Sequence, residues 1–148
     1  MIQLKQFKFE KLQVWEIAMD YAEKIQSISA NFPPKELYNL QSQINRALDS
    51  IALNISEGAT GNSNPEFRKF LGYSIRSIAE VVCCLFKAKR RNYINEETFN
   101  ALYSEAFVLM NRTAALKNSL VTKNNILSHD NKQYTSDTSD FGLRTFYS

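Results

Sequence analysis

The stretch SQINRALDSIALNISEGATGNS, residues 42–63, decides the fold class of the chain. Its apolar residues Ile44, Leu48, Ile51 and Ile55 recur every three or four positions, the spacing that places side chains on one face of an α-helix. A β-strand would instead alternate with a period of two. The stretch therefore predicts an amphipathic helix that buries one face.

The opposite face of the same helix is polar and equally regular. At about 100° per residue, Arg46, Ser50 and Glu57 fall within about 60° of each other, with Asn54 beside them. A solvated surface with weak pairs inside the helix accounts for such a face without any function. Taken alone, these residues favour that explanation.

The length and composition indicate one domain. The chain has 148 residues, of which 44% are apolar, enough for one core and too few for two domains of ordinary size. We find no signal peptide, and the most apolar run, at 78–86, is shorter than the roughly 20 residues that cross a bilayer. Cys83 and Cys84 are adjacent, which suits neither a disulfide between them nor a metal site. We expect a cytoplasmic protein with reduced thiols.

Four segments show helical periodicity, at about residues 10–31, 35–58, 64–91 and 96–121. Amphipathic helices joined by short loops pack most simply as an antiparallel bundle. We therefore predict an all-α, antiparallel up-down-up-down four-helix bundle over residues 9–121. The residues predicted for its core include Trp15, Ile44, Ile51, Phe70, Ile78 and Met110.

Residues that interrupt or cap helices separate these segments. The dipeptide Pro33-Pro34 ends the first helix, and GATG at 58–61 closes the second with glycines suited to a C-terminal cap. Ser63 or Asn64 is placed to cap the third helix, and Asn95 the fourth.

Residues 122–148 differ in composition and predict a flexible C-terminal tail. They are rich in Ser, Thr, Asn and Asp, which is typical of segments that cannot bury a core. The last part, FGLRTFYS, is an exception, because Phe141, Leu143 and Phe146 are too apolar for a purely solvated segment. We expect residues 123–138 to be mobile and these three side chains to contact a groove of the bundle or a neighbouring subunit.

Positive charge is concentrated in the third predicted helix. Residues 68–91 contain seven basic residues and one acid, whereas the whole chain has a net charge of only +3. Such asymmetry suggests an anionic partner or self-association through opposite faces. Four cations lie within about 60° on a helical wheel, with a fifth at their flank. The candidate nucleic-acid-binding residues are Lys69, Arg76, Lys87, Arg90 and, at the flank, Arg91.

Groups that usually carry catalysis are scarce. The single histidine, His129, lies in the tail, and GATG follows a helix without a lysine behind it, so a helix cap is favoured over a phosphate-binding loop. We find no Glu-x-x-His pair of the kind that di-metal helical bundles use. Cys83 has no candidate base. We expect no enzymatic activity, no cofactor and no metal.

The sequence resembles the four-helix-bundle proteins encoded by intervening sequences of bacterial 23S ribosomal RNA genes. The resemblance begins at FEKLQVWEIAMDYA (9–22), continues through residues 32–71 and fades across the third and fourth helices. Its most specific part runs from Gln43 and Arg46 to Glu57 and Gly58. The tail beyond residue 122 has no counterpart that we recognise.

The resemblance implies a bundle without established catalytic activity that assembles into a ring, commonly a pentamer. Related bundles are accessory proteins of diversity-generating retroelements, where they bind a reverse transcriptase and nucleic acid. It also gives the polar face of the second helix a candidate role as a subunit interface. Arg46, Ser50, Asn54 and Glu57 would then set its register, because buried charges must be paired and contribute specificity more than stability.

Three functions compete. The first is a non-enzymatic, oligomeric RNA-binding protein that uses the basic face of the third helix. The second is a protein-interaction scaffold, for example an accessory subunit of a reverse transcriptase, and the third is a bundle enzyme whose site the sequence does not display. RNA binding that falls with salt separates the first two, and metal analysis with a cofactor absorbance scan tests the third.

Overall fold

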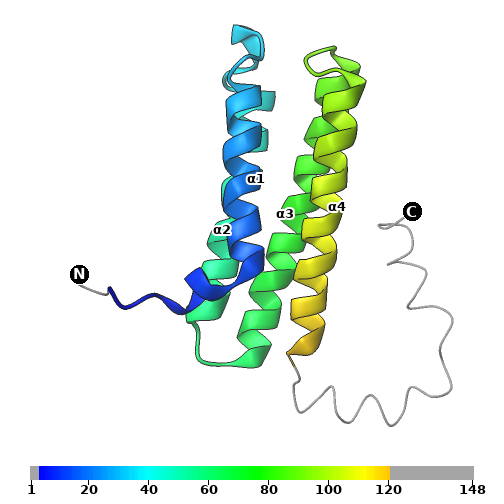
Figure 1. Ribbon diagram of the computed structural model, residues 1–148. Coiled ribbons are helices and arrows are strands. Elements are labelled where there is room, and N and C mark those ends of the chain that lie inside the picture. Colours follow the sequence, from blue (N-terminus) through cyan, green and yellow to red (C-terminus); the bar gives the residue numbers. More distant parts are fainter. Residues whose placement is uncertain (1–3, 121–148) are drawn as a thin grey trace, which may run out of the picture.

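The computed structural model describes residues 4–120, which form four long α-helices and no β-strand. The helices run alternately up and down, and helices adjacent in sequence pack side by side (Figure 1). The predicted all-α four-helix bundle is confirmed, and the predicted tail, residues 122–148, lies outside the described residues. The elements are η1 (Lys8–Lys11), α1 (Gln13–Ser29), η2 (Pro34–Glu36), α2 (Leu40–Thr60), α3 (Asn64–Arg90) and α4 (Glu96–Ser119).

The core lies between the four helices and is mostly aliphatic, with four aromatic members, Tyr21, Phe32, Phe67 and Phe99. The predicted core residues Ile44, Ile51, Ile78 and Met110 are buried. Removal of such side chains from water is the main stabilising term for a bundle of this kind. The largest fully buried side chains are Ile25, Leu40, Ile44, Leu48, Ile51, Ile55, Leu71, Ile78, Val81, Leu85, Leu109 and Thr113.

The prediction that Trp15 and Phe70 lie in the core is wrong, because both side chains remain half-buried. The buried face of α1 is rotated toward Val14 and Tyr21, whose hydroxyl donates a hydrogen bond to the Leu102 carbonyl at 2.9 Å. Trp15 therefore lies at the edge of the face and packs on Phe9, with ring centroids 5.1 Å apart. A wide apolar stripe does not identify which of its residues face the core.

The prediction that GATG at 58–61 closes the second helix is confirmed for Gly61 but wrong for Gly58. α2 continues through Gly58 to Thr60, and Gly61 takes the C-cap position with φ −66° and ψ 174°, an extended rather than a left-handed conformation. Gly58 instead marks a close approach of α2 to α3. A Cβ atom there would lie 2.7 Å from Phe70 Cβ and 2.9 Å from Phe67 Cδ2.

The ends of α3 and α4 follow the sequence predictions. The Ser63 side chain accepts a hydrogen bond from the Glu66 amide at 3.3 Å, and Asn95 accepts one from the Thr98 amide at 2.8 Å. α3 stops because Asn92 adopts a left-handed conformation, φ 61°, which lets the Tyr93 amide donate to the Ala88 carbonyl at 2.9 Å. These caps fix the length of the helix that carries the basic residues.

Candidate nucleic-acid interface

The basic side chains of α3 form a row along its solvent-facing side. We define the basic ridge as Lys69, Arg76, Lys87 and Arg90. Lys69, Arg76 and Arg90 are exposed and Lys87 is half-buried. Lys69 and Arg90 are 21 positions apart, so the ridge is about 30 Å long at a rise of about 1.5 Å per residue.

The ridge is not neutralised by the rest of the described chain. No carboxylate among residues 4–120 lies within ion-pair distance of its four side chains, although Lys24 pairs with Glu105 and Lys89 with Glu96 elsewhere on the bundle. The Lys69 ammonium lies 5.9 Å from the centre of the Tyr73 ring. This cation–π contact positions the charge without removing it. The four cations therefore stay available to an external anion.

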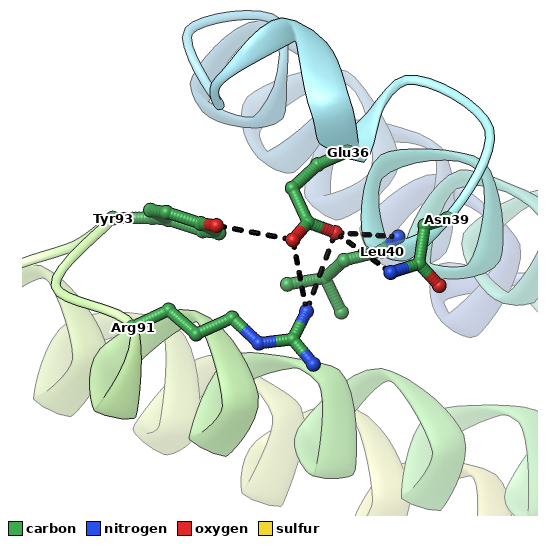
Figure 2. A network of polar contacts seen from close by, with 5 residues as sticks. All are labelled: Glu36, Asn39, Leu40, Arg91 and Tyr93. Carbon is green, nitrogen blue, oxygen red and sulfur yellow. Dashed lines mark hydrogen bonds and ion pairs between the residues drawn. The ribbon is translucent and has the colours of Figure 1, made fainter.

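Arg91, the fifth predicted residue, has a partner within the chain. Its guanidinium donates to both carboxylate oxygens of Glu36, at 3.1 and 3.3 Å (Figure 2). The Tyr93 hydroxyl also donates to Glu36, at 3.0 Å, and the Leu40 amide donates to it at 3.0 Å. Arg91 therefore joins the end of α3 to the start of α2 and is not part of the basic ridge.

Glu36 is buried, so its charge depends on these contacts. Burial alone would raise the pKa of its carboxyl, but the hydrogen bonds from Leu40 and Tyr93 and the charge of Arg91 outweigh burial and lower that pKa. Burial and the hydrogen bond to Glu36 raise the pKa of the Tyr93 hydroxyl. The carboxylate also accepts a backbone N–H at the start of α2, which has no side-chain cap at Asn39.

The four predicted interface residues of α2 divide into two pairs. Asn54 donates to the Ser50 hydroxyl at 2.9 Å, and the Ser77 hydroxyl of α3 donates to the same atom at 2.9 Å. Ser50 and Asn54 are therefore half-buried within the α2–α3 contact. Arg46 and Glu57 are exposed and form no ion pair within residues 4–120. Only this second pair is available to another subunit.

Two hollows adjoin these residues. A polar hollow of about 450 Å³ lies beside Arg46 and Ser50, with Tyr38 and Glu80 also in its lining. A larger groove of about 580 Å³ lies between α3 and α4, with Lys87 and Arg90 at its edge and mainly apolar side chains along its length. Its apolar lining includes Val82, Phe86, Tyr103, Ala106, Phe107 and Met110.

Two features of this region were not predicted from the sequence. Glu36 was not separated from the other acids, although its place two residues after Pro34 and four residues before Leu40 is a signal for a residue that caps a helix. The groove had no signal, because it depends on which parts of the α3 and α4 stripes lack a neighbour.

Within residues 4–120, no three His, Cys, Asp or Glu side chains gather closely enough to hold a metal ion. None of the helices described in that range is long and apolar enough to span a membrane.

The fold and the ridge define a class of small helical bundles in which one helix carries a row of four cations without an ion pair to any residue from 4 to 120. Residues 10–115 match the model of the 23S rRNA-intervening sequence protein family. The match covers most of the chain, so the chain belongs to this family, as the resemblance indicated.

A crystal structure of a protein of unknown function from the S23 ribosomal protein family of Bacteroides thetaiotaomicron is similar to this chain. Its TM-score is 0.66 at 19% sequence identity, over 71% of this chain and 95% of that one. At this identity the similarity supports the fold alone. A comparison with curated proteins found no match.

Proposed function

We propose that this chain is a non-enzymatic RNA-binding protein whose basic ridge contacts the phosphate backbone. The observation that carries the proposal is the row of four cations without an acidic partner in residues 4–120. A helix dipole favours cations only within the last turn, so it explains Lys87 and Arg90 but not Lys69 and Arg76. A row about 30 Å long follows several phosphates of a single strand.

The contact is mainly electrostatic and therefore weakly selective for sequence. Tyr73, beside Lys69, is exposed enough to stack on a base. About four neutralised phosphates on single-stranded RNA give a slope near −3 for the logarithm of the binding constant against that of the salt concentration. A purely hydrophobic contact would not weaken with salt in this way.

The experiment is RNA binding by a charge-reversed ridge. The variant K69E/R76E/K87E/R90E should lose binding to a fluorescent single-stranded RNA while it keeps its helicity. The matched control K5E/K8E/K11E/K35E changes the net charge equally at exposed positions outside α3 and should keep most of the binding. Equal binding by the ridge variant and the parent protein would refute the proposal.

The proposal includes a homo-oligomer, for which the family resemblance suggests a pentamer. Met19 and Leu53 remain exposed, at 39% and 59%, on the faces of α1 and α2, and Arg46 and Glu57 lie beside Leu53 on the surface. A ring repeats the ridge around the assembly, so weak contacts of single subunits combine into avidity.

The assembly is tested by light scattering. The parent protein should scatter as an oligomer at micromolar concentration, and L53D/R46E should scatter as a smaller species with unchanged helicity. A monomeric parent protein would rule out both the ring and an interface role for Arg46 and Glu57.

The competing proposal is a protein-interaction scaffold, for example an accessory subunit of a reverse transcriptase. The apolar groove beside the ridge favours it, because a nucleic acid does not need such a surface. A gene position beside a reverse transcriptase gene, together with unimpaired RNA binding by the ridge variant, would support the scaffold instead. A position inside a ribosomal RNA gene would support the RNA-binding protein.

A further inference from the structure

The groove between α3 and α4 combines an apolar floor with a basic edge. Phe86 is 44% exposed at this groove, although its ring packs edge-on against Phe99 at 4.8 Å. Lys87 and Arg90 border the groove, and none of the residues that line it is acidic. Its surface therefore suits a ligand in which acidic groups stand next to large apolar ones.

The chain itself contains such a segment. SDTSDFGLRTFYS, residues 136–148, places Asp137 and Asp140 immediately before Phe141, Leu143 and Phe146. The two acids match the basic edge, and the three apolar side chains match the floor. Arg144 is the only cation of the segment, so its side chains keep a net charge of −1. We propose that this segment binds in the α3–α4 groove of its own bundle, with its aspartates at Lys87 and Arg90.

The geometry of the bundle agrees with the length of the connection. The Arg68 side chain, near the start of α3, donates to the Lys117 and Leu120 carbonyls, so α4 ends beside the start of α3. The basic edge lies about 20 residues further along α3, which is about 30 Å away. Leu120 and Phe141 are separated by 20 residues, and a random-coil chain of about 20 residues has an end-to-end distance of about 25 Å. A tether gives the highest effective concentration when its length matches the span in this way.

A second apolar pair in the same tail does not meet this condition. Ile126 and Leu127 follow Leu120 by only six and seven residues. Seven residues extend to at most about 25 Å, which is short of the basic edge. The binding segment is therefore 136–148, and Ile126 and Leu127 provide a matched control.

Cys83 is a probe already built into the groove. It is exposed and lines the groove, whereas Cys84 is buried, and burial raises the pKa of the Cys84 thiol to about 11. Alkylation requires the thiolate, so iodoacetamide near neutral pH should modify Cys83 and leave Cys84 nearly unmodified. A segment bound in the groove would shield Cys83.

The experiment measures the alkylation rate of Cys83 in the full chain without nucleic acid. With an effective concentration of about 1 mM and a segment affinity of about 0.1 mM, occupied grooves outnumber empty ones about tenfold. F141S/L143S/F146S should therefore raise the rate about tenfold, and I126S/L127S should leave it unchanged. C83A should abolish the signal.

A second variant pair tests the charged edge. K87E/R90E should raise the alkylation rate of Cys83, and K87E/R90E/D137K/D140K should lower that rate again. Each of these variants is compared with a version of itself that also carries F141S/L143S/F146S. This comparison removes the effect of the nearby charges on the thiol itself. Equal rates in the parent protein and F141S/L143S/F146S would overturn the proposal. Shielding that disappears on dilution would overturn it as well, because the segment would then occupy the groove of another copy.

Discussion

The close approach at Gly58 leads to a prediction of opposite sign for two identical substitutions. At Gly58 in α2, an added Cβ would lie 2.7 Å from Phe70 Cβ, which is attached directly to the backbone of α3. Real Cβ atoms essentially never come this close, so the two helices must separate. At Gly72, in the interior of α3, the nearest atom is the Lys117 ammonium nitrogen, 3.6 Å away at the end of a flexible side chain.

The magnitudes follow from two opposing effects. Alanine is favoured over glycine inside a helix by about 1 kcal/mol. Overpacking of a core costs about 1–3 kcal/mol, and the contact with Phe70 Cβ places Gly58→Ala at the upper end. Gly58→Ala should therefore lower the free energy of unfolding by about 2 kcal/mol. Gly72→Ala, which meets no obstacle, should raise it by up to about 1 kcal/mol.

Thermal unfolding followed by circular dichroism measures both variants. About 1 kcal/mol corresponds to about 4 °C in a bundle of this size, so the two Tm values should lie about 12 °C apart, on either side of the parent protein. Protein concentration must be equal in all samples, because assembly stabilises the folded state. A Tm for Gly58→Ala at or above that of the parent protein would refute the close packing of α2 on α3.

Two further predictions concern buried groups. Ile51→Asp should lower the free energy of unfolding, measured by urea titration, by more than about 4 kcal/mol, because Ile51 is 0% exposed and the carboxylate would lack a partner. The control Val108→Asp, at a site that is 46% exposed, should change the free energy of unfolding by less than about 0.5 kcal/mol. Glu36→Gln should lower Tm at pH 7. Because the pKa of Glu36 is lowered from 4.5 in the folded state, its contribution is complete above pH 4.5 and disappears as the pH falls through the folded pKa. The Tm difference should therefore narrow as the pH falls below 4.5, whereas Glu96→Gln, at an exposed ion pair, should show no comparable narrowing.

Helix periodicity predicted the architecture because the signal is repeated over more than five turns in each of the longer helices. Caps such as Ser63 and Asn95 are local, so they were also predictable from sequence. The rotation of α1 was not, because its stripe is wider than the face that its neighbours cover. Trp15 and Val14 both belong to the apolar stripe, and only the packing of α1 against its neighbours decides that Val14 is buried.

The candidate site was predictable only in its periodic part. Lys69, Arg76, Lys87 and Arg90 share one face of a continuous helix, so their spacing places them in one row. Arg91 has the same charge, yet its partner lies 55 positions earlier in the chain. Such a contact depends on how η2 and the end of α3 meet in space, which no local pattern encodes.

Two contacts between α2 and α3 together set the shape of the basic ridge. Gly58 holds the start of α3 against the end of α2, close to Lys69, and the Glu36–Arg91 pair holds the end of α3 against the start of α2, next to Arg90. α3 is thus fixed to α2 at both ends, and a helix fixed in this way presents its cations at constant spacing. An RNA strand that binds the ridge must then supply all of the ordering, since the protein side is already ordered. Loosening either end should therefore weaken RNA binding although the four charges of the ridge itself remain unchanged. Glu36→Gln alters an acid outside the ridge, so weaker binding at neutral pH would reflect the position of α3 and not its charge.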